Sequence, residues 1–336
     1  DDLLGLKAQL LVNLNFRYNV RPDEASSAKA LIKISKDMID VLGTERVNYD
    51  EFLARSRQLV TGTCVGIGQR HIGIANNQYD WVIIDEAARS IASELAIAMQ
   101  AGKRVLLVGD HKQLPPLYSE PHKKELALKL GVNSNDIDDL VASDFARAFE
   151  SEYGKRTGAQ LLTQYRMAPA IGSMVSHCFY ENKLENGERI IPPIYGEAPK
   201  FMSSYVTWMD TSKLGKKANH NSDRGVSIYN RAEAEEIINL LNEVSIDMDL
   251  VANLADHVKE GEAAIGVICM YGEQKRILRQ KFKEQAWDDK FKSLIKIDTV
   301  DSYQGKENRI IILSITRSDI KLKPGFLRSP NRINVA

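Results

Sequence analysis

The stretches WVIIDE (residues 81–86) and RVLLVGD (residues 104–110) decide the fold of this chain. Each is a short, continuous apolar run that ends in acidic residues, and residues 91–100 between them have the apolar spacing of a helix. Apolar strands that alternate with helices are typical of a parallel sheet covered on both faces. We therefore predict an α/β fold in which ligands bind beyond the carboxyl ends of these strands.

The same pattern of strands and helices continues through the chain. Further strands are predicted at 59–65, 160–162, 205–208, 264–270, 295–297 and 309–315. Helices are predicted at 28–42, 48–57, 169–179, 231–244 and 273–284. This order predicts three parts: a helical insertion or stalk at 1–57, a first sheet domain at 58–155 and a second sheet domain at 156–336.

The composition is that of an ordinary soluble protein with two domains. The 336 residues are 43% hydrophobic and 27% charged. Lys+Arg and Asp+Glu are both 45, which does not exclude a nucleic-acid binder because a local basic groove is enough. The cysteines, Cys64, Cys178 and Cys269, lack metal-ligand spacing and are predicted to be buried, reduced thiols. Without a membrane-length apolar run or a signal peptide, a cytoplasmic location away from membranes is predicted.

Two acids at the end of the first strand are the first chemical signal. A carboxylate such as Asp85 suits Mg²⁺, which prefers oxygen ligands and keeps its waters. A second carboxylate such as Glu86 can orient or deprotonate an attacking water. Alone, the pair could also be two solvated acids with no catalytic role. The stretch GDHKQLPP (residues 109–116) at the end of the next strand favours the functional interpretation.

Several short stretches, taken together, resemble the motifs of superfamily-1 helicases. DEAA (85–88) and VGDHKQLPP (108–116) resemble motifs II and III. QYRM (164–167), TVDSYQGKE (299–307) and NRINVA (331–336) are similar to motifs IV, V and the opening of VI, and TGT (61–63) is similar to the motif before the Asp-Glu strand. The resemblance is greatest to the superfamily 1B branch, which includes the nonsense-mediated-decay RNA helicase and moves 5′ to 3′ on single strands. It implies two RecA-like domains that hydrolyse ATP between them.

The resemblance also implies a role for each nucleotide-binding residue. Asp85 would hold the Mg²⁺ of bound ATP through water, Glu86 would position the hydrolytic water, and Gln113 would sense the γ-phosphate. Arg166 would reach the γ-phosphate from the second domain as an arginine finger. The remaining nucleotide contacts would be made by Tyr165, Gly305 and Glu307. Tyr165 would lie against the base or ribose and Glu307 would contact the ribose; Tyr165 could instead be core packing.

The expected partner is single-stranded DNA or RNA. By the same resemblance, Thr61, Thr63 and Thr299 would donate hydrogen bonds to its phosphates. Thr61 could instead be an ordinary β-branched strand residue.

Two departures from the family bear on the activity of this chain. The family's phosphate-binding loop, Gly-x-x-x-x-Gly-Lys-[Ser/Thr], is missing, because no Gly-Lys pair here precedes Ser or Thr. Residues 334–336 stop where relatives continue toward a second γ-phosphate arginine. These departures predict a fragment with an incomplete first domain, inactive alone, from an enzyme that is active at full length. The alternative is a non-catalytic nucleic-acid-binding or scaffold module on a degenerate helicase core.

Overall fold

The structure, a computed structural model, describes residues 25–42, 49–133, 137, 141, 143–191, 199, 202, 204–222, 227–258, 262–318 and 323–336. The chain divides into two compact units, with the division between Gly109 and Asp110. The predicted domain limits at 57 and 155 stay predictions, and residues 1–24 of the predicted stalk lie outside the described residues.

The first unit contains a pair of parallel strands joined by a helix. Strand β1 (Tyr79–Ile84) pairs with β2 (Gly102–Leu107), and α5 (Ala92–Met99) connects them. The other helices of this unit are α2 (Ala25–Leu42), α3 (Tyr49–Ser56), α4 (Cys64–Ile67) and the short 3₁₀ turns η2 (Arg70–Ile72), η3 (Ile74–Asn76) and η4 (Ala87–Arg89). Small and branched apolar residues fill its core, among them Ile84, Ala88, Leu95 and Ala98. The predicted strand–helix–strand order is therefore confirmed.

The second unit has a three-stranded parallel sheet in the order β6-β5-β7. Its strands are β5 (Ile265–Cys269), β6 (Ile295–Thr299) and β7 (Ile310–Ser314). A smaller parallel pair consists of β3 (Thr163–Gln164) and β4 (Glu185–Asn186). The helices and 3₁₀ turns of this unit are α6 (Glu120–Leu130), α8 (Asp144–Glu150), α9 (Glu152–Thr157), α10 (Pro169–Phe179), η6 (Ser212–Ala218), α12 (Arg231–Ile246), α13 (Met248–Asp256), α14 (Gly272–Lys283), α15 (Asp289–Ser293), η7 (Val300–Ser302), η8 (Gly325–Arg328) and α16 (Pro330–Val335).

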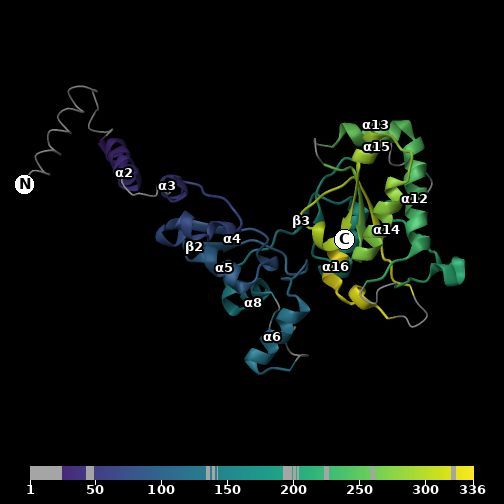
Figure 1. Cartoon of the computed structure of the whole chain (residues 1–336), viewed down its shortest axis with the longest axis horizontal. Helices are drawn as coiled ribbons and strands as arrows, with labels where there is room; N and C mark the ends of the chain where they lie inside the picture. Colours follow the sequence, from purple (N-terminus) through teal and green to yellow (C-terminus); the bar gives the residue numbers. More distant parts are fainter. Residues whose placement is uncertain are drawn as a thin grey trace, which may run out of the picture. The chain divides into compact units, whose positions relative to one another are not determined.

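The central strand β5 is buried on both faces, as a continuous apolar run predicts. Its odd-numbered residues, such as Val267, pack in a core with α12, α13, α14 and α15. Its residue Ile268 packs in a second cluster with residues of η7, η8 and α16, including Val300 and Ile333. Figure 1 shows α12 and α14 along one side of this sheet. The predicted α/β RecA-like fold is confirmed.

Three predicted strands are absent. Residues 59–63 have no regular structure and Cys64 begins a helix, because the Thr63 hydroxyl accepts the Gly66 amide (3.0 Å) and caps α4. Residues 160–162 and 205–208 also form no strand, and their apolar side chains Leu161 and Trp208 are 93% and 78% exposed. β-Branched and aromatic composition alone does not make a strand where no partner strand covers it.

One buried polar pair ties α12 and α14 together. The Gln274 side chain is fully buried; its Oε1 accepts the Asn230 amide (2.8 Å) and its Nε2 donates to the Asn230 carbonyl (3.3 Å). The Asn230 side chain in turn donates to the Ala218 and Thr316 carbonyls and caps α12 through Glu233. The pair therefore fixes the start of α12 against the end of β7.

We expect Gln274→Leu to lower the free energy of unfolding by about 2–4 kcal/mol, because two buried main-chain groups lose their partner. Gln280→Leu on the same helix is the matched control, since the Gln280 side chain is exposed and bonds only Glu284; its effect should stay within about 0.5 kcal/mol. Urea unfolding followed by circular dichroism measures both. Equal midpoints for the two variants would contradict the structural importance of this pair.

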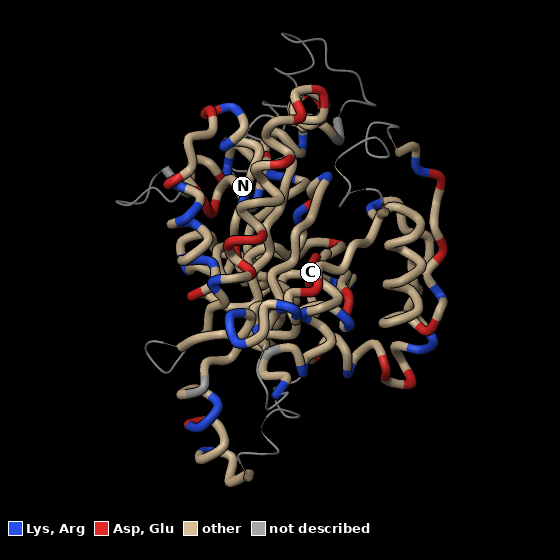
Figure 2. Tube along the Cα trace, turned by 90° about the vertical axis from the view of Figure 1, so that its right-hand side faces the viewer, with Lys and Arg blue, Asp and Glu red and all other residues tan. Residues whose placement is uncertain are grey.

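Charges of both signs are interspersed along the trace in Figure 2, as the balanced composition predicts. Within the described parts of the chain, no helix combines the length and the apolar character needed to span a bilayer.

The prediction of three buried thiols is wrong for Cys178, which is exposed near the end of α10, and Cys64 is only half-buried. Burial raises the pKa of the Cys269 thiol to about 12, so this thiol is the inert one.

Candidate nucleotide and nucleic-acid sites

The ends of β1 and β2 lie side by side in the first unit. The ladder continues past the strands, with the Val108 amide donating to Ile84 (2.8 Å) and the Ala87 amide donating to Val108 (2.9 Å). Gly109 is required here, because a Cβ at this position would lie 2.9 Å from the Ala88 nitrogen. The tight pairing presents Asp85 and Glu86 at the carboxyl edge, where ligands bind in sheets of this kind.

Both acids of this edge are exposed, and one has a strained backbone. Glu86 has φ 53°, in the left-handed region that a residue with a side chain rarely adopts. Its amide donates to Asp85 Oδ1 (2.9 Å), which fixes the carboxylate of Asp85. Such strain concentrates at functional sites. Carboxylate oxygens are the donors that Mg²⁺ prefers, and Mg²⁺ needs only one or two of them beside substrate phosphates; the pair fits this requirement.

The two threonines of the TGT stretch precede α4. Thr61 is exposed and lies outside any strand, so its interpretation as an ordinary strand residue is wrong. Thr63 is also exposed, but its hydroxyl oxygen is the cap of α4. A contact of Thr63 with a phosphate would therefore use the hydroxyl as donor while its oxygen accepts the Gly66 amide.

In the second unit, Gln113 lies in a loop organised by one carboxylate. Asp110 Oδ2 accepts the Gln113 side-chain amide (3.0 Å) and Oδ1 accepts the Lys112 backbone amide (2.9 Å). The loop conformation is thus set within four residues of sequence, because the Asp110 side chain accepts hydrogen bonds from residues two and three positions further on.

The structure brings together two residues predicted to act on the nucleotide. Arg166 Nε donates to Glu307 Oε1 at 2.6 Å, although the two lie 141 residues apart, and both side chains are more than half exposed. Tyr165 is 66% exposed, so core packing is not its role, and its ring lies so close to Gly187 that a side chain there would clash. Gly305, with φ 77°, forms the left-handed turn just before Glu307.

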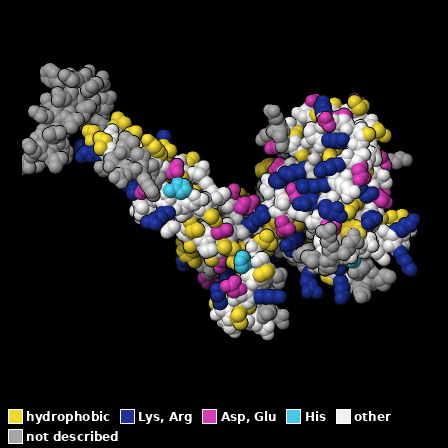
Figure 3. All heavy atoms as spheres, viewed as in Figure 1, with side chains coloured by type: hydrophobic (Ala, Val, Ile, Leu, Met, Phe, Trp, Pro, Cys, Tyr) yellow, Lys and Arg dark blue, Asp and Glu magenta, His cyan; other side chains and the backbone are white. Residues whose placement is uncertain are grey.

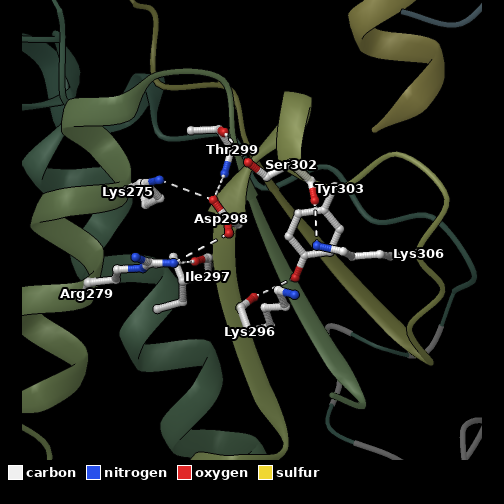
Figure 4. Close-up of polar contacts among 9 residues, drawn as sticks. All are labelled: Lys275, Arg279, Lys296, Ile297, Asp298, Thr299, Ser302, Tyr303 and Lys306. Atoms are coloured by element: carbon white, nitrogen blue, oxygen red, sulfur yellow. Dashed lines mark hydrogen bonds and ion pairs between the residues drawn. The ribbon is translucent and has the colours of Figure 1, made fainter. Parts of the chain in front are cut away.

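Thr299 is the last residue of β6, and Asp298 holds it in place. Asp298 Oδ1 accepts the Thr299 amide (2.8 Å), while the Thr299 hydroxyl lies 3.4 Å from that of Ser302 (Figure 4). The Lys275 ammonium, on α14, is 3.2 Å from the same carboxylate, and an Arg279 Nη2 is 3.6 Å from it. The arrangement leaves a hydroxyl pair at the end of the strand, bordered by cations.

Two more cations lie near Tyr303, one of them further back along β6. Figure 4 shows Lys296 and Lys306 near Tyr303, whose hydroxyl donates to the Lys296 carbonyl (2.7 Å). The Lys306 ammonium donates to the Ser302 carbonyl (2.7 Å). The contact with the Lys296 side chain, together with partial burial, lowers the pKa of Lys306. Two ammonium groups this close to one another favour an anion between or beside them.

The single carboxylate of this group stays ionised. Burial tends to raise the pKa of Asp298, but the Thr299 amide and the charges of Lys275 and Arg279 outweigh it, so the pKa lies below its ordinary value. Two of the four cations drawn in Figure 4, Lys275 and Arg279, therefore pair with this carboxylate. The space-filling view in Figure 3 shows Lys and Arg side chains interspersed with acids on the visible face of this unit. A local cationic surface is thus present without a net positive chain.

This cluster and its anchor Asp298 were not predicted from the sequence. Asp298 could have been noticed because it directly precedes Thr299 at a strand end. Lys275 and Arg279 are four residues apart on α14 and so share one helix face. No sequence signal connects that face with β6, since the register of helix and strand is a tertiary property. In the described parts of the chain, no three His, Cys, Asp or Glu side chains form a group that could hold a metal by themselves.

Comparisons with known proteins identify the family. Two family models, each described as an AAA domain, match residues 12–120 and 140–336. The Regulator of nonsense transcripts 1 homolog of Neurospora crassa is 31% identical over 297 residues, which cover 84% of this chain and 24% of that protein. Helicase sen1 of Schizosaccharomyces pombe is 31% identical over 288 residues, which cover 84% of this chain and 15% of that protein. ATP-dependent helicase NAM7 of Saccharomyces cerevisiae is 29% identical over 343 residues, which cover 98% of this chain and 30% of that protein.

This chain therefore spans less than a third of the length of each of these three relatives. The two family models together cover most of it. The chain belongs to the superfamily 1B helicases, in the AAA-domain family that its two halves match.

Proposed function

We propose that this chain is the motor region of an ATP-dependent helicase or translocase that moves 5′ to 3′ on single-stranded DNA or RNA. The end of β6 carries the proposal: the Thr299 hydroxyl lies beside that of Ser302 and directly follows Asp298, which pairs with Lys275 and Arg279. Such a surface binds the phosphates of a strand without reading its bases, which a motor that steps along any sequence requires. The relatives named as ATP-dependent helicases support the same proposal.

For the nucleotide, the proposal assigns the roles that the resemblance implies. Asp85 would hold Mg²⁺ through water, and Glu86 would orient the water that attacks the γ-phosphate. Mg²⁺, when bound with ATP, supplies positive charge to the phosphate oxygens. Gln113 would sense the γ-phosphate, Arg166 would stabilise its charge, and Tyr165, Gly305 and Glu307 would bind the base and ribose. The direction of movement is part of the proposal by resemblance alone; the cytoplasmic location and Mg²⁺ are carried into it from the sequence.

The strand-binding part can be tested at Thr299. In a motor that contains this chain, Thr299→Val should weaken single-strand binding about three- to tenfold, because one hydrogen bond from an uncharged donor to a phosphate is lost. Thr299→Ser should restore binding, and Thr157→Val, at an exposed threonine on α9, is the control. Fluorescence anisotropy with labelled homopolymer strands measures the affinities. Parent-like affinity of the valine variant would contradict a Thr299 contact.

The salt dependence separates the threonine from the lysines of the cluster. Thr299→Val should leave the slope of log affinity against log salt unchanged, because no charge is removed. Lys306→Gln should reduce that slope by about 0.7, the value for one neutralised phosphate on a single strand. If strand-stimulated ATP hydrolysis is absent from the parent motor, the non-catalytic nucleic-acid-binding or scaffold alternative replaces the proposal.

A further inference from the structure

The loop that carries Gln113 is held by a helix from the far end of the chain. Two asparagines one turn apart on α16 donate to three consecutive loop carbonyls. Asn331 Nδ2 donates to the carbonyls of His111 (3.0 Å) and Gln113 (2.6 Å), and Asn334 Nδ2 donates to that of Lys112 (2.9 Å). Because all three carbonyls are engaged, the path of the loop backbone depends on α16.

A tyrosine at the end of α10 completes this arrangement. The Tyr180 hydroxyl donates to Asp110 Oδ2 at 2.5 Å and accepts from Asn334 Nδ2 at 2.8 Å. It therefore bonds the same carboxylate oxygen that accepts the Gln113 side-chain amide (3.0 Å). Burial and the Asp110 carboxylate raise the pKa of Tyr180 far above its usual value, which keeps the hydroxyl protonated as a donor.

Two phenylalanine rings on α8 also support the loop. His111 lies 5.4 Å from Phe149, which stacks on the buried Phe145. The loop is thus supported by α8, α10 and α16, which are distant from one another in sequence. From outside the loop, the Tyr180 hydroxyl bonds both the organising carboxylate of the loop and the helix that holds the loop carbonyls.

We propose that Tyr180 is a positioning residue for ATP hydrolysis: its hydroxyl joins Asp110 to Asn334 and thereby fixes the orientation of the Gln113 side-chain amide. The inference rests on the proposed function, in which Gln113 contacts the γ-phosphate. Asp110 has two side-chain donors on one oxygen, Tyr180 and Gln113. Without the tyrosine, the Lys112 amide still holds Oδ1, but Oδ2 loses a donor, so the Gln113 amide bonded to Oδ2 is less firmly oriented.

The test is Tyr180→Phe in a motor that contains this chain. The kcat of strand-stimulated ATP hydrolysis should fall about tenfold, because a hydrogen bond to a charged group is lost, while the KM for ATP stays near the parent value. Tyr153→Phe is the matched control, since the Tyr153 side chain is 69% exposed and remote from this loop in sequence. A variant whose folded fraction keeps the parent kcat overturns the inference, even when its melting temperature falls.

A double-mutant cycle shows whether Tyr180 acts through Gln113. In a Gln113→Ala background, Tyr180→Phe should have almost no further effect on kcat, because there is no amide left to orient. If Gln113→Ala slows hydrolysis and Tyr180→Phe does not, the inference fails and the proposed function stands. If Gln113→Ala has no effect, the proposed role of Gln113 fails and the inference fails with it.

Amide hydrogen exchange gives a readout that does not require hydrolysis. The Lys112 amide donates to Asp110 Oδ1 (2.9 Å), so its protection reports the order of the carboxylate. In this chain, Tyr180→Phe should speed exchange at Lys112 and Gln113 several-fold and leave β5 unchanged, whereas Tyr153→Phe should change neither. Unaltered exchange in the Tyr180→Phe protein would overturn the inference.

Discussion

Replacing Glu86 by glutamine in an active motor that contains this chain is expected to slow ATP hydrolysis about 10²–10⁴-fold and to leave nucleotide affinity near its parent value. Glutamine keeps the size of the side chain but cannot take a proton from water. The backbone strain also stays unchanged, because glutamate and glutamine have the same steric cost at φ 53°. The loss would therefore come from the carboxylate alone.

Two further variants separate the roles at this strand end. Asp85→Asn should weaken the binding of Mg²⁺-nucleotide, because this acid is assigned to the metal and not to the water. Glu181→Gln is a close control, since Glu181 is another exposed glutamate with positive φ (56°); its kcat should equal that of the parent. Nucleotide titration and steady-state ATPase assays measure both quantities. If Glu86→Gln hydrolyses ATP at the parent rate, the assignment of the water to Glu86 is wrong.

Backbone strain offers an independent check on Glu86. Glycine adopts φ 53° freely, so Glu86→Gly should relieve about 1 kcal/mol of strain while it removes the carboxylate. A variant that unfolds at higher urea and does not hydrolyse ATP would indicate that the strained conformation is kept for function. Lower stability of the glycine variant would contradict that explanation.

The elements that the sequence predicts best are those with both a buried face and a clear boundary signal. Helix α10 begins at Pro169 and ends at Phe179 as predicted, since proline favours the first turn of a helix. Strand β5 follows from a continuous apolar run that is typical of a buried strand. A similar run predicted β1, although Ile84 is its only buried residue in the structure. Helices α13 and α15 were missed, although Asp247 and Asp288 cap them and could have marked their starts.

In the candidate sites, likewise, some residues can be predicted from local sequence and others depend on tertiary contacts. Residues at strand ends, such as Glu86 and Thr299, can be predicted because a parallel sheet gathers its ligands at its carboxyl edge. The partners that complete the sites come from elsewhere in the chain: Lys275, on a helix that packs on β6, pairs with Asp298, and Tyr180, 70 residues after Asp110, donates to its carboxylate. Such contacts depend on tertiary packing, which no local period or composition encodes.

The second large effect is expected at Arg166. In a motor that contains this chain, Arg166→Lys should lower kcat on the order of 10³-fold, as for an arginine finger. Lysine keeps the charge but lacks the planar fork that holds two phosphate oxygens at once. The loss should appear in kcat more than in KM, because charge on the phosphate oxygens changes in the transition state.

Folding cannot account for a loss of this size. The Arg166 and Glu307 side chains are 54% and 59% exposed, and ion pairs between exposed residues contribute little to stability. Arg276→Lys is the matched control, because Arg276 is an exposed arginine paired with Glu273 (2.7 Å) in the same unit. Both lysine variants should unfold at the parent urea concentration, and only Arg166→Lys should lose turnover.

The ion pair between Arg166 and Glu307 adds a second test, because it joins the residue assigned to the γ-phosphate to the residue assigned to the ribose. If Glu307 serves only the ribose, Glu307→Gln should raise the KM for ATP and leave kcat unchanged. If Glu307 also orients the guanidinium through the 2.6 Å contact to Nε, kcat should fall as well. In that case the double variant with Arg166→Lys should be no slower than Arg166→Lys alone. Steady-state kinetics of the parent, the two single variants and the double variant decide between these outcomes. An Arg166→Lys motor with the parent kcat would rule out the role of Arg166 as an arginine finger and, with it, the orienting role of Glu307.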